Sequence, residues 1–176
     1  MRETEIKILN INPAHITKKL LSLGAQKQPT ALVIEKSFDF PNRKLGHKKS
    51  LLRLRKVGKT AELTYKTIAK KAGPLKTREE TETRVENFEI MEQILRAIGL
   101  HLQWHREKKR TSFTLGKTKF EIDEYPRLPP YLEIEGSQEE IGKYVKLLGF
   151  TMKQASLLSA TKLLKQHKVN HVHLVF

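Results

Sequence analysis

The segment ETEIK, residues 3–7, carries a charged side chain at every second position: Glu3, Glu5 and Lys7. If this segment is a β-strand, the three side chains point to one face of a sheet, because successive strand residues alternate between the two faces. A face made only of charged groups ordinarily contacts water. Which fold the segment indicates therefore depends on whether this face is exposed to solvent or lines a cavity that holds a charged ligand.

The same alternation of charged and apolar residues recurs in later segments. Arg53 and Arg55 alternate with leucines in LRLR, and Glu133 and Glu135 alternate with apolar residues in YLEIE. The other positions with this pattern are Lys66, Arg78, Glu80, Glu82, Lys108, Arg110, Glu121 and Asp123. For any single pair, a solvent-exposed sheet face is the ordinary explanation. Carboxylates recur on some segments and Arg or Lys on others, which favours a shared charged cavity instead.

Turn signals from proline, glycine and asparagine divide the chain into short segments. Eight strands are predicted, at residues 2–9, 32–40, 49–56, 60–68, 75–86, 102–115, 117–125 and 130–136. Four helices are predicted, at residues 12–24, 87–99, 137–149 and 154–167. Asn12 before Pro13, and the capping box from Ser137 to Glu140, mark two of the helix starts. Eight strands fit several sheet architectures, including a closed barrel.

Each predicted helix carries an apolar stripe, which has to pack against another apolar surface. The strands offer such a surface on the face opposite their charges, at Leu52, Leu54, Leu63, Phe120, Ile122, Leu132 and Ile134. If the helices cover this face from outside and the sheet closes, the charged face lines an interior lumen. Buried charges are costly unless they are paired or bind a ligand. The seven basic and eight acidic candidates therefore predict a polyanionic ligand bound together with divalent cations.

The residue types match such a ligand. Arg and Lys bind phosphate oxygens, and Arg often does so at two points. Carboxylates are ligands that Mg²⁺ and Mn²⁺ prefer, usually together with water. ETEIK is therefore predicted to supply two metal-binding carboxylates, Glu3 and Glu5, and one phosphate-binding amine, Lys7.

With these motifs the sequence resembles the CYTH family, the triphosphate tunnel metalloenzymes, which include class IV adenylyl cyclases and thiamine triphosphatases. ETEIK resembles the family's E-x-E-x-K signature. The supporting motifs follow in the family's order: RLR (53–55), LTYK (63–66), KTREETE (76–82), EKKR (107–110), FEIDEY (120–125) and YLEIEG (131–136). The resemblance implies an α+β fold, in which an eight-stranded antiparallel β-barrel forms the triphosphate tunnel and helices pack on the outside. It implies a domain over residues 1–166 with a C-terminal tail at residues 167–176.

The resemblance also implies a role for each charged position. Metal ligands or their supports would be Glu3, Glu5, Glu121, Asp123, Glu133 and Glu135. Triphosphate would be bound by Lys7, Arg53, Arg55, Lys66, Arg78, Lys108 and Arg110. Catalytic residues would be Glu80, Glu82 and Lys66, with the two glutamates orienting basic groups or a water molecule. The chain departs from the family at SATKLL, residues 159–164, where many members carry a serine–tyrosine pair.

The implied activity is that of an enzyme that needs Mg²⁺ or Mn²⁺ and acts on a triphosphate. Two reactions fit the same lumen. In hydrolysis, water attacks the terminal phosphorus; in cyclisation, ATP is converted to cyclic AMP and pyrophosphate. The sequence contains no recognisable adenine-binding motif, which favours hydrolysis. Inorganic, nucleoside and thiamine triphosphate all remain open as substrates.

The basic composition leaves a non-catalytic alternative, a module that binds RNA or polyphosphate. The chain has 34 Lys and Arg against 19 Asp and Glu, a net charge of +15. Without the site candidates, 27 basic and 11 acidic residues remain, a net charge of +16, so the outer surface is basic on its own. RNA-binding modules usually stack bases on aromatic residues, yet the clusters NRKLGHKK and KKAGPLK contain none. A basic surface with weak nucleic-acid contact is the favoured interpretation.

The expected location in the cell rests on features that the sequence does not contain. There is no run of 18 apolar residues that would predict a membrane-spanning helix, and no apolar leader near the N-terminus. Cysteine is absent, which excludes disulfides and thiol catalysis. We therefore expect a cytoplasmic protein without membrane contact, either a monomer or a homodimer.

Overall fold

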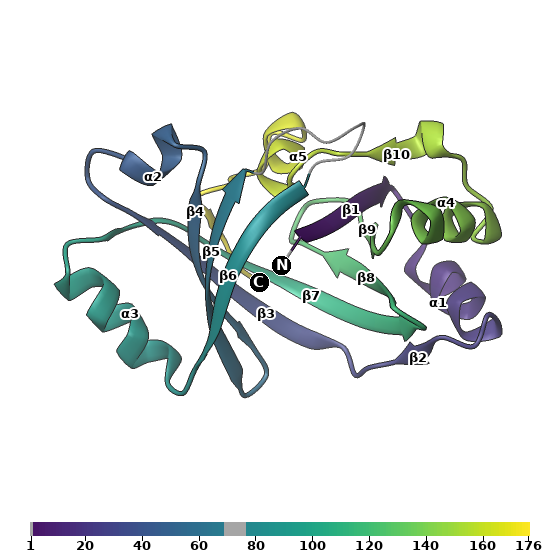
Figure 1. The fold of residues 1–176 in the computed structure, drawn as a ribbon, viewed down its shortest axis with the longest axis horizontal. Coiled ribbons are helices and arrows are strands. Elements are labelled where there is room, and N and C mark those ends of the chain that lie inside the picture. The colour runs from purple at the N-terminus through teal and green to yellow at the C-terminus, as the bar shows by residue number, and fades with distance from the viewer. Residues whose placement is uncertain (1, 69–76) are drawn as a thin grey trace.

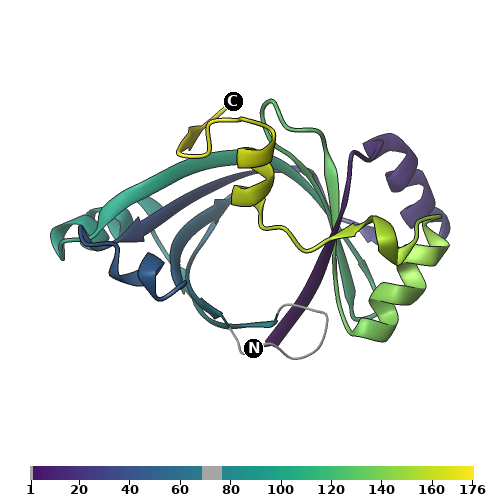
Figure 2. The same cartoon turned by 90° about the horizontal axis from the view of Figure 1, so that it is seen from above.

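The computed structural model describes residues 2–68 and 77–176, with side chains described for residues 4–67 and 79–176. Over this part of the chain, eight long β-strands pair edge to edge in an antiparallel ring, as Figure 1 and Figure 2 show. They are β1 (Arg2–Leu9), β3 (Ala31–Asp39), β4 (Leu51–Val57), β5 (Thr60–Ile68), β6 (Thr77–Val85), β7 (His101–Leu115), β8 (Thr118–Glu124) and β9 (Tyr131–Glu135). The order round the ring is β1-β6-β5-β4-β3-β7-β8-β9, and β9 pairs again with β1. The predicted α+β barrel with outer helices is confirmed.

The register of the barrel strands places charged residues of neighbouring strands side by side. Lys7 of β1 lies opposite Glu133 of β9, and Arg110 of β7 lies opposite Asp123 of β8. Residues directly opposite each other in adjacent strands point to the same face of the sheet. The charged positions of successive strands therefore form one continuous inner surface.

Short strands extend the barrel beyond the prediction. They are β2 (Gln26–Lys27), β10 (Ala155–Ser156) and β11 (His173–Leu174). β2 and β11 pair with β7, the latter in parallel, and β10 pairs with β1. Strands of two residues are too short to show an alternating pattern in the sequence.

The predicted helices at residues 12–24, 87–99 and 137–149 form where their caps predict. They are α1 (Pro13–Ser22), α3 (Phe88–Ala97) and α4 (Gln138–Leu147). Their N-cap side chains, Asn12, Asn87 and Ser137, each accept a hydrogen bond from a backbone N–H in the first turn. No helix in residues 2–68 and 77–176 is long and apolar enough to cross a membrane.

The predicted helix at residues 154–167 is wrong at its start. A 3₁₀ turn, η1 (Met152–Gln154), and strand β10 precede α5 (Ala160–Gln166). The backbone of β10 pairs with β1, and the Ser159 side chain caps α5, so residues 155–159 cannot join α5.

The short helix α2 (Lys44–His47) was not predicted. It follows Asp39, which is buried at the end of β3. The Asp39 carboxylate accepts hydrogen bonds from the backbone N–H groups of Phe40, Leu45 and Gly46, at 2.7, 2.9 and 2.8 Å. These bonds fold the chain back at this point.

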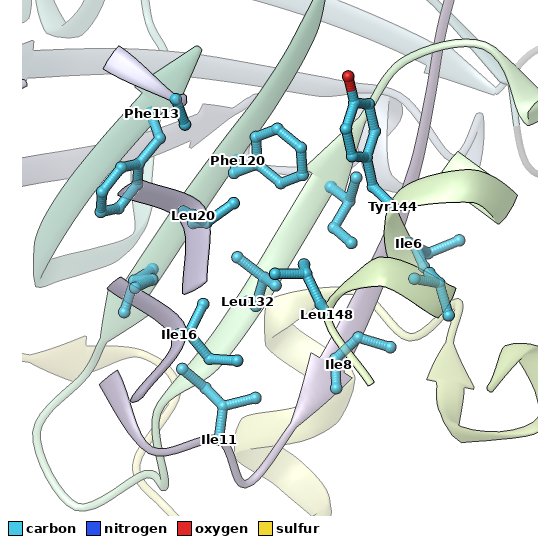
Figure 3. Close-up of a cluster of buried hydrophobic side chains, with 14 of the residues drawn as sticks. Ile6, Ile8, Ile11, Ile16, Leu20, Phe113, Phe120, Leu132, Tyr144 and Leu148 are labelled. Atoms are coloured by element: carbon cyan, nitrogen blue, oxygen red, sulfur yellow. The ribbon is translucent and has the colours of Figure 1, made fainter. Parts of the chain in front are cut away.

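Apolar clusters join the helices to the outer face of the barrel. Figure 3 shows Leu20 of α1 and Tyr144 of α4 packed with Phe120 and Leu132 of the strands. On the other side, Phe88 and Leu95 of α3 join a second cluster on β3, β4 and β5. The predicted apolar strand positions all belong to these clusters: Leu52, Leu54, Leu63, Phe120, Ile122, Leu132 and Ile134. The charged face of the strands therefore points inward.

The C-terminal segment also packs on the barrel. Leu163 and Leu164 of α5 and Leu174 of β11 are buried in a third cluster with Tyr125 and Tyr131. Figure 2 shows α5 and the C-terminus along the rim of the ring of strands.

Candidate functional site: the charged lumen

The charged strand faces surround a cavity of about 250 Å³, which we call the lumen. The predicted site residues that line it are Glu5, Lys7, Arg53, Arg55, Lys66, Glu80, Glu82, Lys108, Arg110, Glu121, Glu133 and Glu135. Asp123 is completely buried in the wall beside Arg110. The side chains of Glu3 and Arg78 lie outside the described part of the structure. The fold thus brings together charges that are spread over more than a hundred residues of sequence.

The lumen also contains residues that the sequence prediction missed. Glu35, Trp104, Arg106 and Lys119 line it together with Tyr125, which follows β8, and Tyr131 of β9. Arg106 precedes Lys108 by two residues and so continues the alternation that identified Lys108 and Arg110. That signal could have found it. Glu35 shares its strand face with Val33 and Ser37, so no charged neighbour two residues away marked it.

The most completely paired group of charges lies between β7 and β8. Arg110 donates from Nε and Nη2 to the two carboxylate oxygens of Asp123, both at 2.7 Å. Its Nη1 forms an ion pair with Glu121. Lys108 Nζ lies 2.9 Å from Asp123, and the Tyr131 hydroxyl donates to the same carboxylate at 3.0 Å. Burial opposes ionisation of Asp123, but the charges of Arg110 and Lys108 outweigh it and hold the pKa of Asp123 below its usual range.

Glu35 is the equivalent anchor on β3. Its carboxylate accepts from Arg53 Nη1 at 3.2 Å and from the Tyr125 hydroxyl at 3.2 Å, and it lies 3.8 Å from Lys108 Nζ. Burial would raise the pKa of Glu35, but Lys108 and Arg53 lower it to about 2. Glu35 is therefore ionised at neutral pH and holds two cations of the lumen wall.

Pairs across β4, β5 and β6 complete the wall. Arg55 forms an ion pair with Glu62. Lys66 Nζ lies 2.5 Å from Glu80, and the Thr64 hydroxyl donates to Glu82 at 3.0 Å. Each pair joins residues on adjacent strands, so the strand register fixes the basic groups in place.

Glu5 and Glu133 form a carboxyl pair beside Lys7. Lys7 Nζ lies 3.1 Å from Glu5 and 3.5 Å from Glu133. Burial, partly offset by Lys7 and reinforced by the Glu5 charge, raises the pKa of Glu133 to about 7. Burial opposes ionisation of Glu5, but the hydrogen bond from Glu133 and the charge of Lys7 lower the pKa of Glu5 to about 2. Glu133 is therefore protonated below a pH of about 7, and in that state it can donate to the Glu5 carboxylate.

The carboxyl pair fits a divalent cation that also contacts phosphate. Two carboxyl groups that share a proton offer oxygen ligands and negative charge where a cation could replace that proton. Among the described side chains, no three Asp, Glu, His or Cys residues gather as a metal-binding cluster. Mg²⁺ is usually held by one or two carboxylates together with substrate phosphates and water, so Glu5 and Glu133 suffice for that mode.

The ion pairs of the lumen wall do not use every hydrogen-bond donor of its arginines. The Nε atoms of Arg53 and Arg55 are buried and lack hydrogen-bond partners within the described part of the chain. Buried donors are nearly always paired in native proteins. The lumen therefore retains hydrogen-bonding capacity for an acceptor-rich ligand.

Comparison with known families agrees with this architecture. The family model described as the CYTH domain matches residues 1–166. The chain belongs to the CYTH family. Its E-x-E-x-K segment supplies the carboxyl and amine of Glu5 and Lys7 beside Glu133. No curated protein sequence matches this CYTH chain.

Solved structures share the fold of this CYTH domain. The PH1012 protein from Pyrococcus horikoshii OT3 is 25% identical, with a TM-score of 0.74 over 92% of this chain and 98% of that one. The PH1819 protein from the same organism is 21% identical, with a TM-score of 0.75 over 93% and 98%. HpAC1 from Hippeastrum, for which a dominant triphosphatase activity is described, is 17% identical, with a TM-score of 0.70 over 96% and 99%.

Proposed function

We propose that this CYTH domain is a divalent-metal-dependent enzyme that binds a triphosphate in the lumen and hydrolyses it. The observation that carries the proposal is the convergence of cations on one cavity that also holds a carboxyl pair. The cations are Lys7, Arg53, Arg55, Lys66, Lys108 and Arg110. They suit the oxygens of a phosphate chain, while Glu5 and Glu133 suit Mg²⁺ or Mn²⁺.

The basic groups are positioned before substrate arrives. Asp123 holds Arg110 and Lys108 from within the wall, and Glu35 holds Arg53. Fixed cations need little rearrangement when charge develops on phosphate oxygens, which is the main source of acceleration in phosphoryl transfer. In this proposal Asp123 is an anchor for two phosphate-binding cations, because its oxygens already accept their hydrogen bonds.

The reaction needs a group that orients the attacking water. Glu82 lines the lumen, and its carboxylate accepts from Thr64 but has no salt-bridge partner among the described residues. Burial opposes its ionisation, but the Thr64 hydrogen bond and the charge of Arg55 hold the pKa of Glu82 below its usual value. Glu82 is therefore ionised, and we assign it to orient the attacking water by accepting its hydrogen bond; Lys66, held by Glu80, is assigned to bind phosphate. A bound divalent cation would neutralise phosphate charge and orient the chain.

Cyclisation of ATP remains the alternative reaction of the same lumen. HpAC1 supports hydrolysis only as a protein of the same fold, since its identity to this chain is 17%. The two reactions differ in products: hydrolysis of the terminal group releases phosphate, whereas cyclisation releases pyrophosphate and a cyclic nucleotide.

A substrate panel tests the proposal. The protein is incubated with inorganic triphosphate, thiamine triphosphate, ATP and GTP, with Mg²⁺, with Mn²⁺ and with excess chelator. Phosphate, pyrophosphate and cyclic nucleotide are measured. We expect metal-dependent release of phosphate from at least one substrate. Release of pyrophosphate with cyclic AMP would replace hydrolysis by cyclisation, and turnover of no substrate with either metal would reject both.

A further inference from the structure

Arg106 differs from the other cations of the lumen. It is 2% exposed, and among the described residues no carboxylate forms a salt bridge with it, whereas Lys7, Arg53 and Arg110 each have one. Its Nε donates to the backbone carbonyl of His171 at 2.6 Å, and its Nη1 donates to the Thr161 hydroxyl at 2.9 Å.

The remaining nitrogen of Arg106, Nη2, is buried and has no hydrogen-bond partner among the residues that the structure describes. Desolvation lowers the pKa of the Arg106 guanidinium, with only distant compensation from Tyr125 and Glu35. A buried cation with an unused N–H and no counter-ion is costly, and an anion at Nη2 would remove that cost.

A second cavity of about 160 Å³ adjoins the lumen at this end, and we call it the annex. Trp104, Thr161 and Ser159 are among the residues that line both cavities. Lys49 lines the annex but not the lumen. None of the described residues that line the annex is Asp or Glu, whereas several carboxylates line the lumen. The annex therefore suits an anionic group that is bound without a metal.

Counted from Arg110, Arg106 lies further along β7 than Lys108, so an anionic group bound by Arg106 would lie beyond the phosphate groups bound by Arg110 and Lys108. The three cations alternate along β7, so successive members are about 7 Å apart along the strand. An anionic chain lying along β7 from Arg110 past Lys108 would next meet Arg106 and the Thr161 hydroxyl. The Arg106 guanidinium also covers the Trp104 ring at 4.2 Å, which disfavours stacking of a planar organic group on that side.

We propose that Arg106 and Thr161 form a phosphate subsite at the mouth of the annex. This subsite binds a fourth phosphate group of a linear polyphosphate whose other groups occupy the lumen. The inference rests on the proposed function, because it takes the lumen to hold the first three phosphates. It extends the proposed substrate class from inorganic triphosphate to inorganic chains of four or more phosphates, which the subsite would favour.

Binding of inorganic triphosphate and tetraphosphate, measured by titration calorimetry with Mg²⁺, tests the subsite. Wild type is expected to bind tetraphosphate about tenfold more tightly, the gain from one additional charge-assisted hydrogen bond. Arg106→Gln should lose this gain and leave triphosphate affinity unchanged. Arg106→Lys should keep part of it, since the charge remains, and Thr161→Val should lose a smaller part.

Lys109→Gln is the matched control, because Lys109 lies next to Lys108 on β7 but is exposed, with Nζ 4.9 Å from the Phe176 ring. It removes the same charge from the outer face and should change neither affinity. A melting curve shows whether Arg106→Gln folds. If it does not, the affinities of wild type and of Arg106→Lys for triphosphate and tetraphosphate still test the subsite.

Three results would overturn the subsite. One is equal affinity of the wild type for both chains. Another is an equal loss for both chains in Arg106→Gln, which would place Arg106 in the triphosphate site itself. The third is a gain for ATP or thiamine triphosphate over inorganic triphosphate that Arg106→Gln removes, since the annex would then hold an organic group. Absence of any triphosphate binding by wild type would instead contradict the proposed function, and this inference with it.

Discussion

Arg110 and Asp123 face each other across β7 and β8 and form a two-point ion pair, with both N–O distances at 2.7 Å. Asp123 is fully buried, and Lys108 shares its carboxylate. A single acidic residue in the barrel wall thus balances two cations that face the lumen. The stability of the barrel and the positions of the two lumen cations depend on the same carboxylate.

Asp123→Asn is therefore expected to destabilise the fold. It removes the charge but keeps the shape, leaving Arg110 and Lys108 buried with less compensation. Loss of one partner from a buried ion pair costs about 3 kcal/mol or more. Urea unfolding of the variant measures this cost, and Glu124→Gln, the next residue on β8, should cost far less. An Asp123→Asn protein as stable as wild type would show that Asp123 is not an anchor.

Glu5→Gln tests the carboxyl pair. The change keeps the size of the side chain but removes an oxygen ligand and its charge, so turnover should fall by orders of magnitude and the Mg²⁺ requirement should weaken. Folding should be affected less than in Glu35→Gln, because the Glu5 side chain is 44% exposed and its charge is partly screened by water. Steady-state assays over a Mg²⁺ series measure both effects, with Glu139→Gln, an exposed residue of α4, as the control. Full turnover in Glu5→Gln, or wild-type turnover in excess chelator, would argue against metal binding by this pair.

Arg55→Gln tests phosphate binding by the β4 cations. Loss of a charge-assisted contact should weaken triphosphate binding by about 2 kcal/mol. Lys56→Gln is the neighbour on the outer face, where Lys56 pairs with Glu89 of α3, and it should leave affinity unchanged. Titration calorimetry distinguishes the two. Equal affinities for wild type and Arg55→Gln would place Arg55 outside the site.

The lowered pKa of Glu35 predicts that the folded protein loses stability in acid. Its pKa is about 2 in the folded protein against 4.5 for an unperturbed glutamate. A lowered folded-state pKa contributes stability that is fully present above the unfolded value and is lost as pH falls towards 2. The shift corresponds to about 3 kcal/mol.

Glu35→Gln should therefore be much less stable than wild type at neutral pH, and the difference should shrink as pH falls from 4.5 towards 2. Unfolding free energies from urea titrations at several pH values measure it. A difference that stays constant over this pH range would mean that the Glu35 charge does not stabilise the fold.

The basic outer surface makes a separate prediction. Lys44 and Lys48 lie in the exposed basic cluster around α2, whereas Lys70 and Lys71 of the KKAGPLK cluster fall outside the described residues. RNA bound to such a surface should need no metal and should weaken steeply with salt through counterion release. Triphosphate binding in the lumen should depend on metal and resist moderate salt, because buried pairs are poorly screened.

Charge reversal at Lys44 and Lys48 should weaken RNA binding and leave triphosphate turnover intact. Melting temperatures with triphosphate, with and without Mg²⁺ at two salt concentrations, provide the comparison. Triphosphate bound at a hundredfold excess over Kd should stabilise the fold by about 3 kcal/mol. Tight RNA binding at physiological salt without any metal-dependent triphosphate shift would favour the binding-module interpretation.

The alternation of charges was enough to predict the barrel and most of its inner surface. It could not separate Glu121 from Asp123, which share one strand face by sequence. Only the neighbouring Arg110, Lys108 and Tyr131 determine that Asp123 is buried in the wall while Glu121 lines the lumen. Such partners come from other strands, so a local pattern does not contain them.

The end of the chain was harder to predict for the same reason. The start of α5 depends on the pairing of β10 with β1, and β11 exists only because β7 offers a free edge beside His105. Arg106 carried the right local signal, but only the assembled barrel shows that no carboxylate of the described residues pairs with it.

The pairing of β1 with β9 has a consequence for how the chain acquires its structure. Glu5 and Glu135 are partners in the register although 130 positions separate them. During synthesis, β1 emerges first and keeps an unpaired edge until almost the whole barrel sequence has been made. Closing such a distant contact costs chain entropy before it is rewarded, so folding should be slow compared with helical proteins of this size. The edge of β1 is then the segment most exposed to pairing with the wrong chain.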